Sequence, residues 1–497
     1  MAKALMIQGT GSDVGKSVIV AGLCRIARRK GLSVAPFKPQ NMSNNAQACI
    51  SGGEIGRAQA LQARACGLAP HTDFNPVLLK PQTDKIAQII IQGYPVTVMD
   101  AKDYMAKRGD FLDAVMESFN RLSAKYDLIL VEGAGSPAEI NLRARDIANM
   151  GFARQAGVPV CLVGDIERGG VIASVVGTKT VIAPKDAAMI TSFIINKFRG
   201  DPALFEDGVR EIETHTGWPC FGVIPWLHAT AHLPAEDAVN LSYTSASNTP
   251  VIRIAAPMLS RMANFDDADP LRLEPNVEFQ WVPPGKPIPH NIDVIILFGT
   301  KSTFGDLAFL RAQGWNHDIL AHARAGKRAL GLCGGYQMLG KRIFDPDGVD
   351  GIAGECEGLG LLDIETIMRT KKTVRPIKGR CTITQTPITG YEIHVGETTG
   401  ADTLRPFLFL ENTLKDSVRK DGARNPNGNI EGSYVHGLFA SNEFRTAWLE
   451  RMKAGASSRL DYEVSVDKAL EDFADGLEAA LDIEAIFASA QTTGWQA

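Results

Sequence analysis

Short apolar runs alternate with amphipathic stretches along the first half of the chain, and most of the runs end in polar residues. Segments 18–29 and 54–65 show helical periodicity. The apolar runs predict buried strands at residues 4–7, 32–37, 126–131, 158–165 and 188–195. This alternation predicts a doubly wound, mostly parallel α/β sheet over residues 1–240.

The pattern breaks at residues 241–250, a polar, turn-rich stretch that predicts a linker. A second α/β pattern follows over residues 251–445, with strands expected at 251–255 and 294–298 and a helix at 306–325 interrupted near Gly314. The sequence therefore predicts two α/β domains in succession.

Residues 446–497 form the last segment, which carries helical periodicity. Its expected packing positions are Leu470, Phe473, Leu477 and Leu481. Segment 420–429 is rich in Gly, Asn and Asp and predicts a mobile loop.

Composition restricts the class of protein. A chain of 497 residues is too long for one hydrophobic core, and 45% hydrophobic with 22% charged residues is ordinary for a globular protein. The net charge of −4, without a long basic run, disfavours nucleic acids and membrane surfaces as partners. The first strand follows Met1 too closely for a signal peptide, and none of the eight cysteines is in C-x-x-C spacing. We expect a cytoplasmic protein with reduced cysteines and without a membrane span.

The segment from Gln8 to Ser17 lies between the first strand and the first helix and predicts a phosphate-binding loop. Lys16 is placed to reach the outer phosphates, and the Ser17 hydroxyl to bind Mg²⁺. The usual pattern has Gly where Thr10 stands, so this is a loop one residue longer; the alternative is a chance Gly-rich turn. The expected phosphate-binding residues are Gly11, Val14, Gly15, Lys16 and Ser17.

Three polar residues lie at strand ends, where open parallel sheets bind ligands. Lys38 is placed to neutralise phosphate or an acidic substrate, and the amide-rich loop after it favours recognition over a solvated surface. Glu132 is placed to bind Mg²⁺ directly or through water; the alternative is a turn-capping acid. Asn196 is a candidate for contacting the nucleotide base.

Cys333 is the candidate nucleophile of the second domain. It lies between an apolar strand and a helix and is followed by Gly334 and Gly335, which predicts a sharp nucleophile turn. Nearby N–H groups favour a thiolate and stabilise an oxyanion; the alternative is a buried structural cysteine. By spacing alone either His394 or His436 fits as the base, and both also fit as core histidines.

The motifs of both halves resemble known families. The first half resembles the dethiobiotin-synthetase-like P-loop ligases, which share the longer loop, the Lys-Pro pair and Glu-Gly-Ala-Gly. The second half resembles a class I glutamine amidotransferase domain with a flavodoxin-like α/β fold. In combined order the chain resembles the glutamine-dependent cobyric acid synthases, through the motifs FKPQNMSNNA, VEGAGSPAEINL, GLCGGYQMLG, GYEIHVGET and EGSYVHGLF.

The resemblance implies a reaction and a set of roles. The family amidates carboxylates b, d, e and g of adenosylcobyrinic acid a,c-diamide through acyl phosphates, using ATP, Mg²⁺ and glutamine-derived ammonia. Cys333 is then the nucleophile and His436 its base, with Lys16 and Ser17 holding ATP and Mg²⁺. The expected corrinoid contacts are Gln40, Asn41, Asn44, Asn45, Glu139 and Asn141, and the expected glutamine or oxyanion contacts are Gly299, Gly334 and Gln337.

Leu438 distinguishes the alternatives. Many class I amidotransferases carry a Glu two residues after the histidine, and this chain has Leu438 there. That argues against CTP synthase and leaves the orientation of His436 unexplained. A cobyrinic acid a,c-diamide synthase is a closer alternative, disfavoured by the motif KPQNMSNNA. A non-enzymatic P-loop switch with a binding domain is the third alternative.

Overall fold

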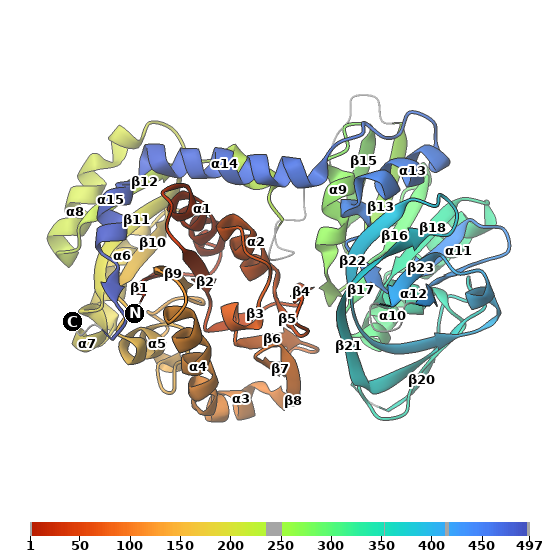
Figure 1. Cartoon of the computed structure of the whole chain (residues 1–497), viewed down its shortest axis with the longest axis horizontal. Helices are drawn as coiled ribbons and strands as arrows, with labels where there is room; N and C mark the ends of the chain where they lie inside the picture. Colours follow the sequence, from red (N-terminus) through yellow and green to blue (C-terminus); the bar gives the residue numbers. More distant parts are fainter. Residues whose placement is uncertain (1, 235–250, 352, 413–416, 495–497) are drawn as a thin grey trace.

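The computed structural model describes residues 2–234, 251–351, 353–412 and 417–494. Two bodies lie side by side, and helix α14 (Tyr462–Ala480) extends from one to the other (Figure 1). We call residues 2–234 together with 462–494 the first body, and residues 251–452 the second body. The predicted linker at 241–250 lies outside the described residues.

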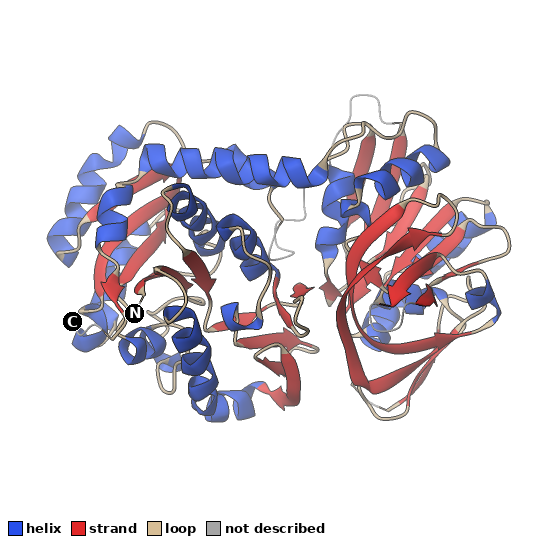
Figure 2. Ribbon diagram, viewed as in Figure 1, coloured by secondary structure: helices blue, strands red, loops and turns tan. Residues whose placement is uncertain are grey.

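The first body is built on one central sheet with helices on both faces (Figure 2). Its six main strands are parallel, and the inner ones are strongly apolar, as expected for strands with both faces covered. The order is β12 (Cys220–Pro225), β11 (Ile190–Phe198), β10 (Val160–Asp165), β1 (Lys3–Gly9), β9 (Leu128–Glu132) and β2 (Val34–Phe37), with β28 (Gln491–Thr492) antiparallel to β1. The predicted doubly wound sheet is confirmed.

Two apolar cores lie on the two faces of this sheet. One contains α1 (Lys16–Arg29), parts of α2 (Arg57–Cys66), α14 and α15 (Ile483–Ala488). The other contains residues of α4 (Leu112–Ser123), α5 (Met150–Ala156), α6 (Val171–Val181) and α8 (Glu206–Thr216), and α7 (Pro184–Ala187) lies beside them.

An extension of the first body faces the second body (Figure 1). It consists of β3 (Gln40–Met42), β6 (Val77–Pro81), β7 (Ile86–Ile91), β8 (Tyr94–Asp100), α3 (Ala101–Lys107) and the pair β4 (Ala46–Ala48) with β5 (Glu54–Gly56). The predicted helix at 54–65 is wrong in its first turn, because residues 54–56 pair antiparallel with β4 and the helix begins only at Arg57.

The second body contains a sheet of flavodoxin-like order, as predicted. Its strands run in the order β15 (Val277–Val282), β13 (Ile252–Pro257), β16 (Val294–Leu297), β18 (Arg328–Leu332), β26 (Ile430–Ser433) and β25 (Ala423–Arg424), the last antiparallel. Its helices are α9 (Asp269–Arg272), α10 (Thr303–Ala312), α11 (Trp315–Arg324), α12 (Gly334–Leu339) and α13 (Asn442–Met452). Gly314 separates α10 from α11, where the interruption was expected.

A further sheet of the second body has no counterpart among the predicted elements. It contains β19 (Arg342–Asp345), β20 (Gly354–Glu357), β21 (Glu365–Cys381), β22 (Pro387–Thr399), β23 (Leu408–Asn412), β24 (Ser417–Asp421) and β27 (Val435–His436), and a separate pair joins β14 (Met262–Ala263) to β17 (Gly299–Thr300). The mobile loop predicted at 420–429 is wrong in its first half, which belongs to β24 and β25. The Asp421 carboxylate there is buried and accepts a hydrogen bond from the Ser433 hydroxyl.

The helices of the C-terminal segment pack in different bodies. Helix α13 packs in the second body, whereas α14 lies against α1 of the first. All four predicted packing positions are buried. A Cβ atom at Gly22 would lie 2.4 Å from Leu477 Cδ1, so the missing side chain allows the two helices to approach closely. The domain boundaries at 240, 250 and 445 stay a prediction. No helix of the described residues is both long enough and apolar enough to cross a membrane.

Candidate active sites

The predicted phosphate-binding loop connects β1 to α1. Gly15 has φ 98°, a left-handed conformation, and a Cβ atom there would lie 2.3 Å from Asn196 Nδ2. Asn196 donates a hydrogen bond to the Val14 carbonyl at 2.8 Å. Asn196, which lies in β11, therefore anchors the phosphate-binding loop. This contact was not predicted, and a role of Asn196 in contacting the nucleotide base stays a prediction.

Lys16 follows the loop and lies across its opening. Its ammonium donates to the carbonyl of Gly11 at 2.8 Å and to the carbonyl of Gly135 at 3.2 Å. These bonds tie the loop to the segment after β9. The structure thus brings the loop, Lys16 and the end of β9 together, as an anion-binding site at a helix start requires.

Glu132 is the centre of a buried polar cluster beside the loop. Its side chain is 1% exposed, and Oε1 accepts from the Ser17 hydroxyl and from the Lys38 ammonium, both at 2.7 Å. Oε2 accepts from the side-chain amides of Gln59 and Gln62 at 3.3 and 2.6 Å. The sequence predicted Ser17, Lys38 and Glu132 but not the two glutamines. Their spacing of three residues on one face of α2 was the available signal.

The predicted corrinoid contacts fall into different environments. Asn41 donates to Gln59 at 2.9 Å, and Gln40 accepts from the hydroxyl of Tyr104 at 2.6 Å. Asn41 therefore supports the cluster around Glu132, and Gln40 contacts α3 within the extension. Glu139 and Asn141 are exposed at and beside the short helical turn η3 (Ile140–Leu142).

Asn45 lies at the contact between the two bodies. Its Oδ1 accepts from the backbone N–H of Asn264 at 2.6 Å, and Asn264 Oδ1 accepts from the N–H of Ala46 at 2.9 Å. Asn264 has φ 53°, which Asn tolerates better than most residues. Part of the amide-rich loop therefore fixes the second body, and Asn44 beside it lines a cavity in that contact.

Cys333 lies at the turn from β18 to α12, with φ 51° and ψ −111°. This backbone conformation is strained for a residue with a side chain, and such strain is typical of nucleophile turns. A Cβ atom at Gly335 would lie 2.0 Å from the Leu297 carbonyl oxygen, and one at Gly334 would lie 2.6 Å from Thr300 Cγ2. The two glycines are thus required by the closeness of β16 and β17.

His436 is fully buried, and its Nδ1 lies 2.7 Å from Asp267 Oδ2. Asp267 belongs to the short helical turn η7 (Phe265–Ala268), and its other oxygen accepts from the N–H of Gly437 at 2.6 Å. Burial alone lowers the pKa of the imidazole, but the charges of Asp267 and Cys333 outweigh burial and raise it to about 10. Many class I amidotransferases carry a Glu where this chain has Leu438, and here Asp267 supplies the acid beside His436. The sequence analysis did not predict Asp267.

Gly299 shows how closely the cysteine and the histidine approach. A Cβ atom there would lie 3.1 Å from His436 Cε1 and 3.5 Å from Cys333 Cβ. His394 is engaged differently: its Nδ1 lies 3.0 Å from the Gly396 carbonyl oxygen, and its ring stacks on Tyr434 with centroids 3.9 Å apart. Geometry therefore favours His436 over His394 as the partner of Cys333.

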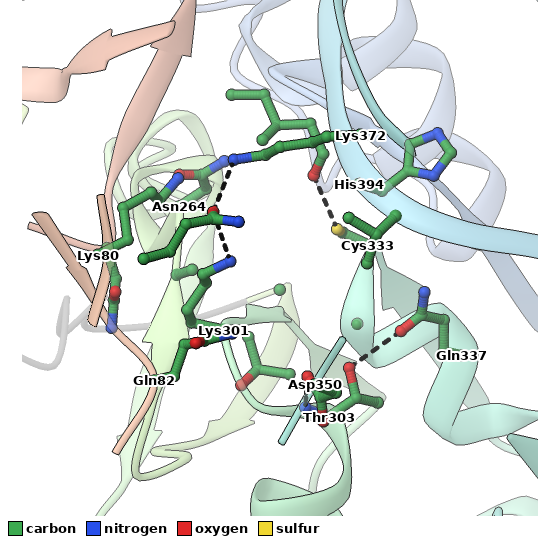
Figure 3. Close-up of a pocket in the computed structure, with 18 of the residues that line it drawn as sticks. Lys80, Gln82, Asn264, Lys301, Thr303, Cys333, Gln337, Asp350, Lys372 and His394 are labelled. Carbon is green, nitrogen blue, oxygen red and sulfur yellow. Dashed lines mark hydrogen bonds between the residues drawn. The ribbon is translucent and has the colours of Figure 1, made fainter. Parts of the chain in front are cut away.

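One cavity joins this site to the first body (Figure 3). All three residues predicted for the glutamine pocket line it, and Gln337 is held by a hydrogen bond from the Thr303 hydroxyl at 3.0 Å. From the first body the cavity receives Asn44, Lys80, Gln82 and Gln88. Part of the cavity lining across from Cys333 is thus supplied by the first body, beside Asn264 and Lys301 of the second (Figure 3).

Comparison with known proteins gives the class first. Residues 5–241 match the family described as "CobQ/CobB/MinD/ParA nucleotide binding domain", and residues 253–444 match the "CobB/CobQ-like glutamine amidotransferase domain". Fold and site together define a glutamine amidotransferase carrying its own P-loop nucleotide-binding unit.

Full-length relatives define the family more narrowly. The chain is 65% identical to the cobyric acid synthase of Hyphomonas neptunium, over 100% of this chain and 99% of that protein. It is 58% identical to the cobyric acid synthase of Paracoccus denitrificans, over 98% of this chain and 100% of that protein. The chain belongs to the cobyric acid synthase family.

Proposed function

We propose that the chain amidates carboxylates b, d, e and g of adenosylcobyrinic acid a,c-diamide, with ATP as the energy source and glutamine as the nitrogen donor. It is thereby a glutamine-hydrolysing ligase of cobalamin biosynthesis. The observation that carries this proposal is the Cys333–His436–Asp267 arrangement, in which Cys333 and His436 line a cavity that the nucleotide-binding body also lines. Family membership supports the same substrate over a cobyrinic acid a,c-diamide synthase.

The second body releases ammonia from glutamine. The Cys333 thiolate attacks the side-chain carboxamide carbon, and N–H groups of the Gly-rich turn stabilise the developing oxyanion. His436 then gives its proton to the leaving ammonia, and water hydrolyses the glutamyl thioester to glutamate. Asp267 holds the proton on Nδ1 and stabilises the imidazolium, so that Nε2 is the atom that exchanges a proton with sulfur and nitrogen.

The first body activates the acceptor. A carboxylate is a poor electrophile, and transfer of the γ-phosphoryl group converts it into an acyl phosphate that ammonia attacks with loss of phosphate. In this proposal Lys16 and Lys38 offset negative charge on the transferring phosphoryl group; their contacts with the loop carbonyl of Gly11 and with Glu132 support this role. Free ammonia is mostly protonated at neutral pH, so release from glutamine beside the first body favours its use.

The residues around Glu132 fit Mg²⁺. The Ser17 hydroxyl and the Glu132 carboxylate are hard oxygen donors in contact with each other, and these two residues would hold the ion. No cluster of three or more His, Cys, Asp and Glu side chains suited to a metal occurs among the described residues. Mg²⁺ usually keeps water and phosphate oxygens as most of its ligands, so two protein oxygen donors are enough to hold it. When bound, the ion neutralises charge on the β- and γ-phosphates.

Mass spectrometry of the corrinoid tests the proposal directly. The a,c-diamide is incubated with the full chain, ATP, Mg²⁺ and glutamine, and we expect four successive carboxylate-to-amide conversions. Omission of ATP should stop all of them. Conversion of cobyrinic acid to the a,c-diamide, with no change of the a,c-diamide itself, would contradict the proposal.

A further inference from the structure

Three lysines line the cavity between the two bodies, and two of them pair with one buried carboxylate, Glu54. Lys80 of the first body donates to Glu54 Oε2 at 2.9 Å, and Lys372 of the second body pairs with Glu54 Oε1. Gln88 Oε1 accepts from Lys301 at 2.9 Å and from Lys372 at 3.3 Å. The cluster joins both bodies and contains two more cationic groups than its one glutamate balances.

The pKa values of the cluster reflect an excess of positive charge, which Glu54 and Asp350 offset only in part. Burial, with the neighbouring Lys372 and Lys80, lowers the pKa of Lys301 to about 7. Burial also lowers the pKa of Lys372 to about 8, although Glu54 opposes that shift. Burial raises the pKa of Glu54, but the two paired lysines outweigh it and hold the value at about 2. Covered cations without a matching anion are unfavourable, and a carboxylate ligand would relieve this.

The cluster lies in the same cavity as Cys333 (Figure 3). Lys372 and Cys333 both line this cavity. Acceptors lie along the same cavity: the Asp350 carboxylate, and Asn44 Oδ1, which is buried and has no hydrogen-bond partner among the described residues. Separate cationic and acceptor groups around one nucleophile match a zwitterionic α-amino acid.

We propose that Lys301, held by Gln88 of the first body, binds the α-carboxylate of glutamine while the carboxamide lies at Cys333. Lys372 shares this carboxylate, and Asp350 with Asn44 receives the α-ammonium group. The inference rests on the proposed glutaminase function and adds a carboxylate subsite to it. Its consequence is that the first body helps to complete the glutamine pocket, through Gln88 and Glu54.

The test compares glutamine with L-glutaminamide, in which a carboxamide replaces the α-carboxylate. Hydrolysis of both is measured with the wild type, Lys301→Met, Lys301→Arg and the control Lys341→Met. Lys341 is half-exposed and pairs with Asp363 at 2.7 Å, away from the cavity lining. We expect Lys301→Met to raise the KM for glutamine roughly 10- to 100-fold, as expected for loss of a charge-assisted bond, and to remove most of the preference over glutaminamide. Arginine should restore part of that preference.

The following results would overturn either this inference or the proposed function. An unchanged preference for glutamine over glutaminamide in folded Lys301→Met would overturn the inference. A raised KM for the corrinoid in ammonium-driven amidation, with glutamine hydrolysis unaffected, would assign the cluster to acceptor carboxylates and overturn it too. Absence of glutamine hydrolysis in the wild type would instead refute the proposed function. Should Lys301→Met fail to fold, Gln88→Leu replaces it, and an unchanged KM for glutamine would then count against the inference.

Discussion

Replacing Asp267 by Asn removes one buried charge and keeps the size of the side chain. In the wild type, Asp267 Oδ2 accepts from His436 Nδ1 at 2.7 Å. The asparagine amide is able to donate to Nδ1, which would place the ring proton on Nε2, the atom that must accept the thiol proton. The substitution therefore changes which nitrogen of the His436 ring carries the proton, and it leaves the volume of the side chain at position 267 nearly unchanged.

The expected magnitude follows from the contact. A buried hydrogen bond to a charged group contributes about 1.5–3 kcal/mol, which corresponds to a roughly 10- to 150-fold loss in kcat/KM. The pH profile should change as well. Asp267 contributes to the raised pKa of His436, about 10, so the wild-type imidazolium should persist well above neutral pH. Because the carboxylate favours the protonated ring, its loss should lower that pKa, and the alkaline limb of glutamine hydrolysis should move to lower pH.

The assay is steady-state glutamate release across pH, beside ammonium-driven amidation by the same preparations. Asp363→Asn, at a half-exposed residue paired with Lys341, is the matched control and should leave both reactions unchanged. Asp267→Asn should keep the ammonium-driven reaction, since the P-loop residues are untouched. Full glutamine hydrolysis with an unshifted pH profile would refute the assigned role, as would equal loss of both reactions in a folded protein.

Further substitutions separate the two chemistries. Cys333→Ala should abolish glutamine-dependent amidation but keep amidation by high ammonium at raised pH; product formation with each donor checks this. Lys16→Ala should reduce corrinoid amidation with either nitrogen source by about 10²- to 10⁴-fold in the same assay, through lost phosphoryl-charge stabilisation. His436→Ala should impair glutamate release far more than His394→Ala, and the reverse order would show the base to be wrongly assigned. Leu477→Ala should destabilise the protein by about 2–5 kcal/mol in urea unfolding, because it leaves a cavity between α14 and α1.

Features encoded by neighbouring residues were predictable. The segment Gly15-Lys16-Ser17 lies between an apolar strand and a helix, and the glycines after Cys333 indicate the sharp turn that the backbone angles show. Both sheets were predicted in outline because buried parallel strands are continuous apolar runs. The mixed sheet around β21 and β22 was missed, because much of it is exposed and its polar residues hide the strand pattern.

Contacts between distant residues were not predictable. Asp267 lies 169 residues before His436, and no spacing rule relates the two. Lys301 and Lys372 look like surface charges in the sequence, and only the packing of the two bodies brings both of them to Gln88 and pairs Lys372 with Glu54. For the same reason the contact of Asn45 with the backbone of Asn264 was not predictable, and its role as a corrinoid contact stays a prediction.

The return of the chain through α14 makes the second body a topological insertion in the first. Strand β28 lies against β1, and α14 covers α1, so the first body is assembled from both sides of the insertion. A stop codon placed before the second body would therefore also strip a helix from the face of the nucleotide-binding core. An ammonium-dependent ligase would instead have to be made by internal deletion, with a short bridge rejoining the first body to the start of α14.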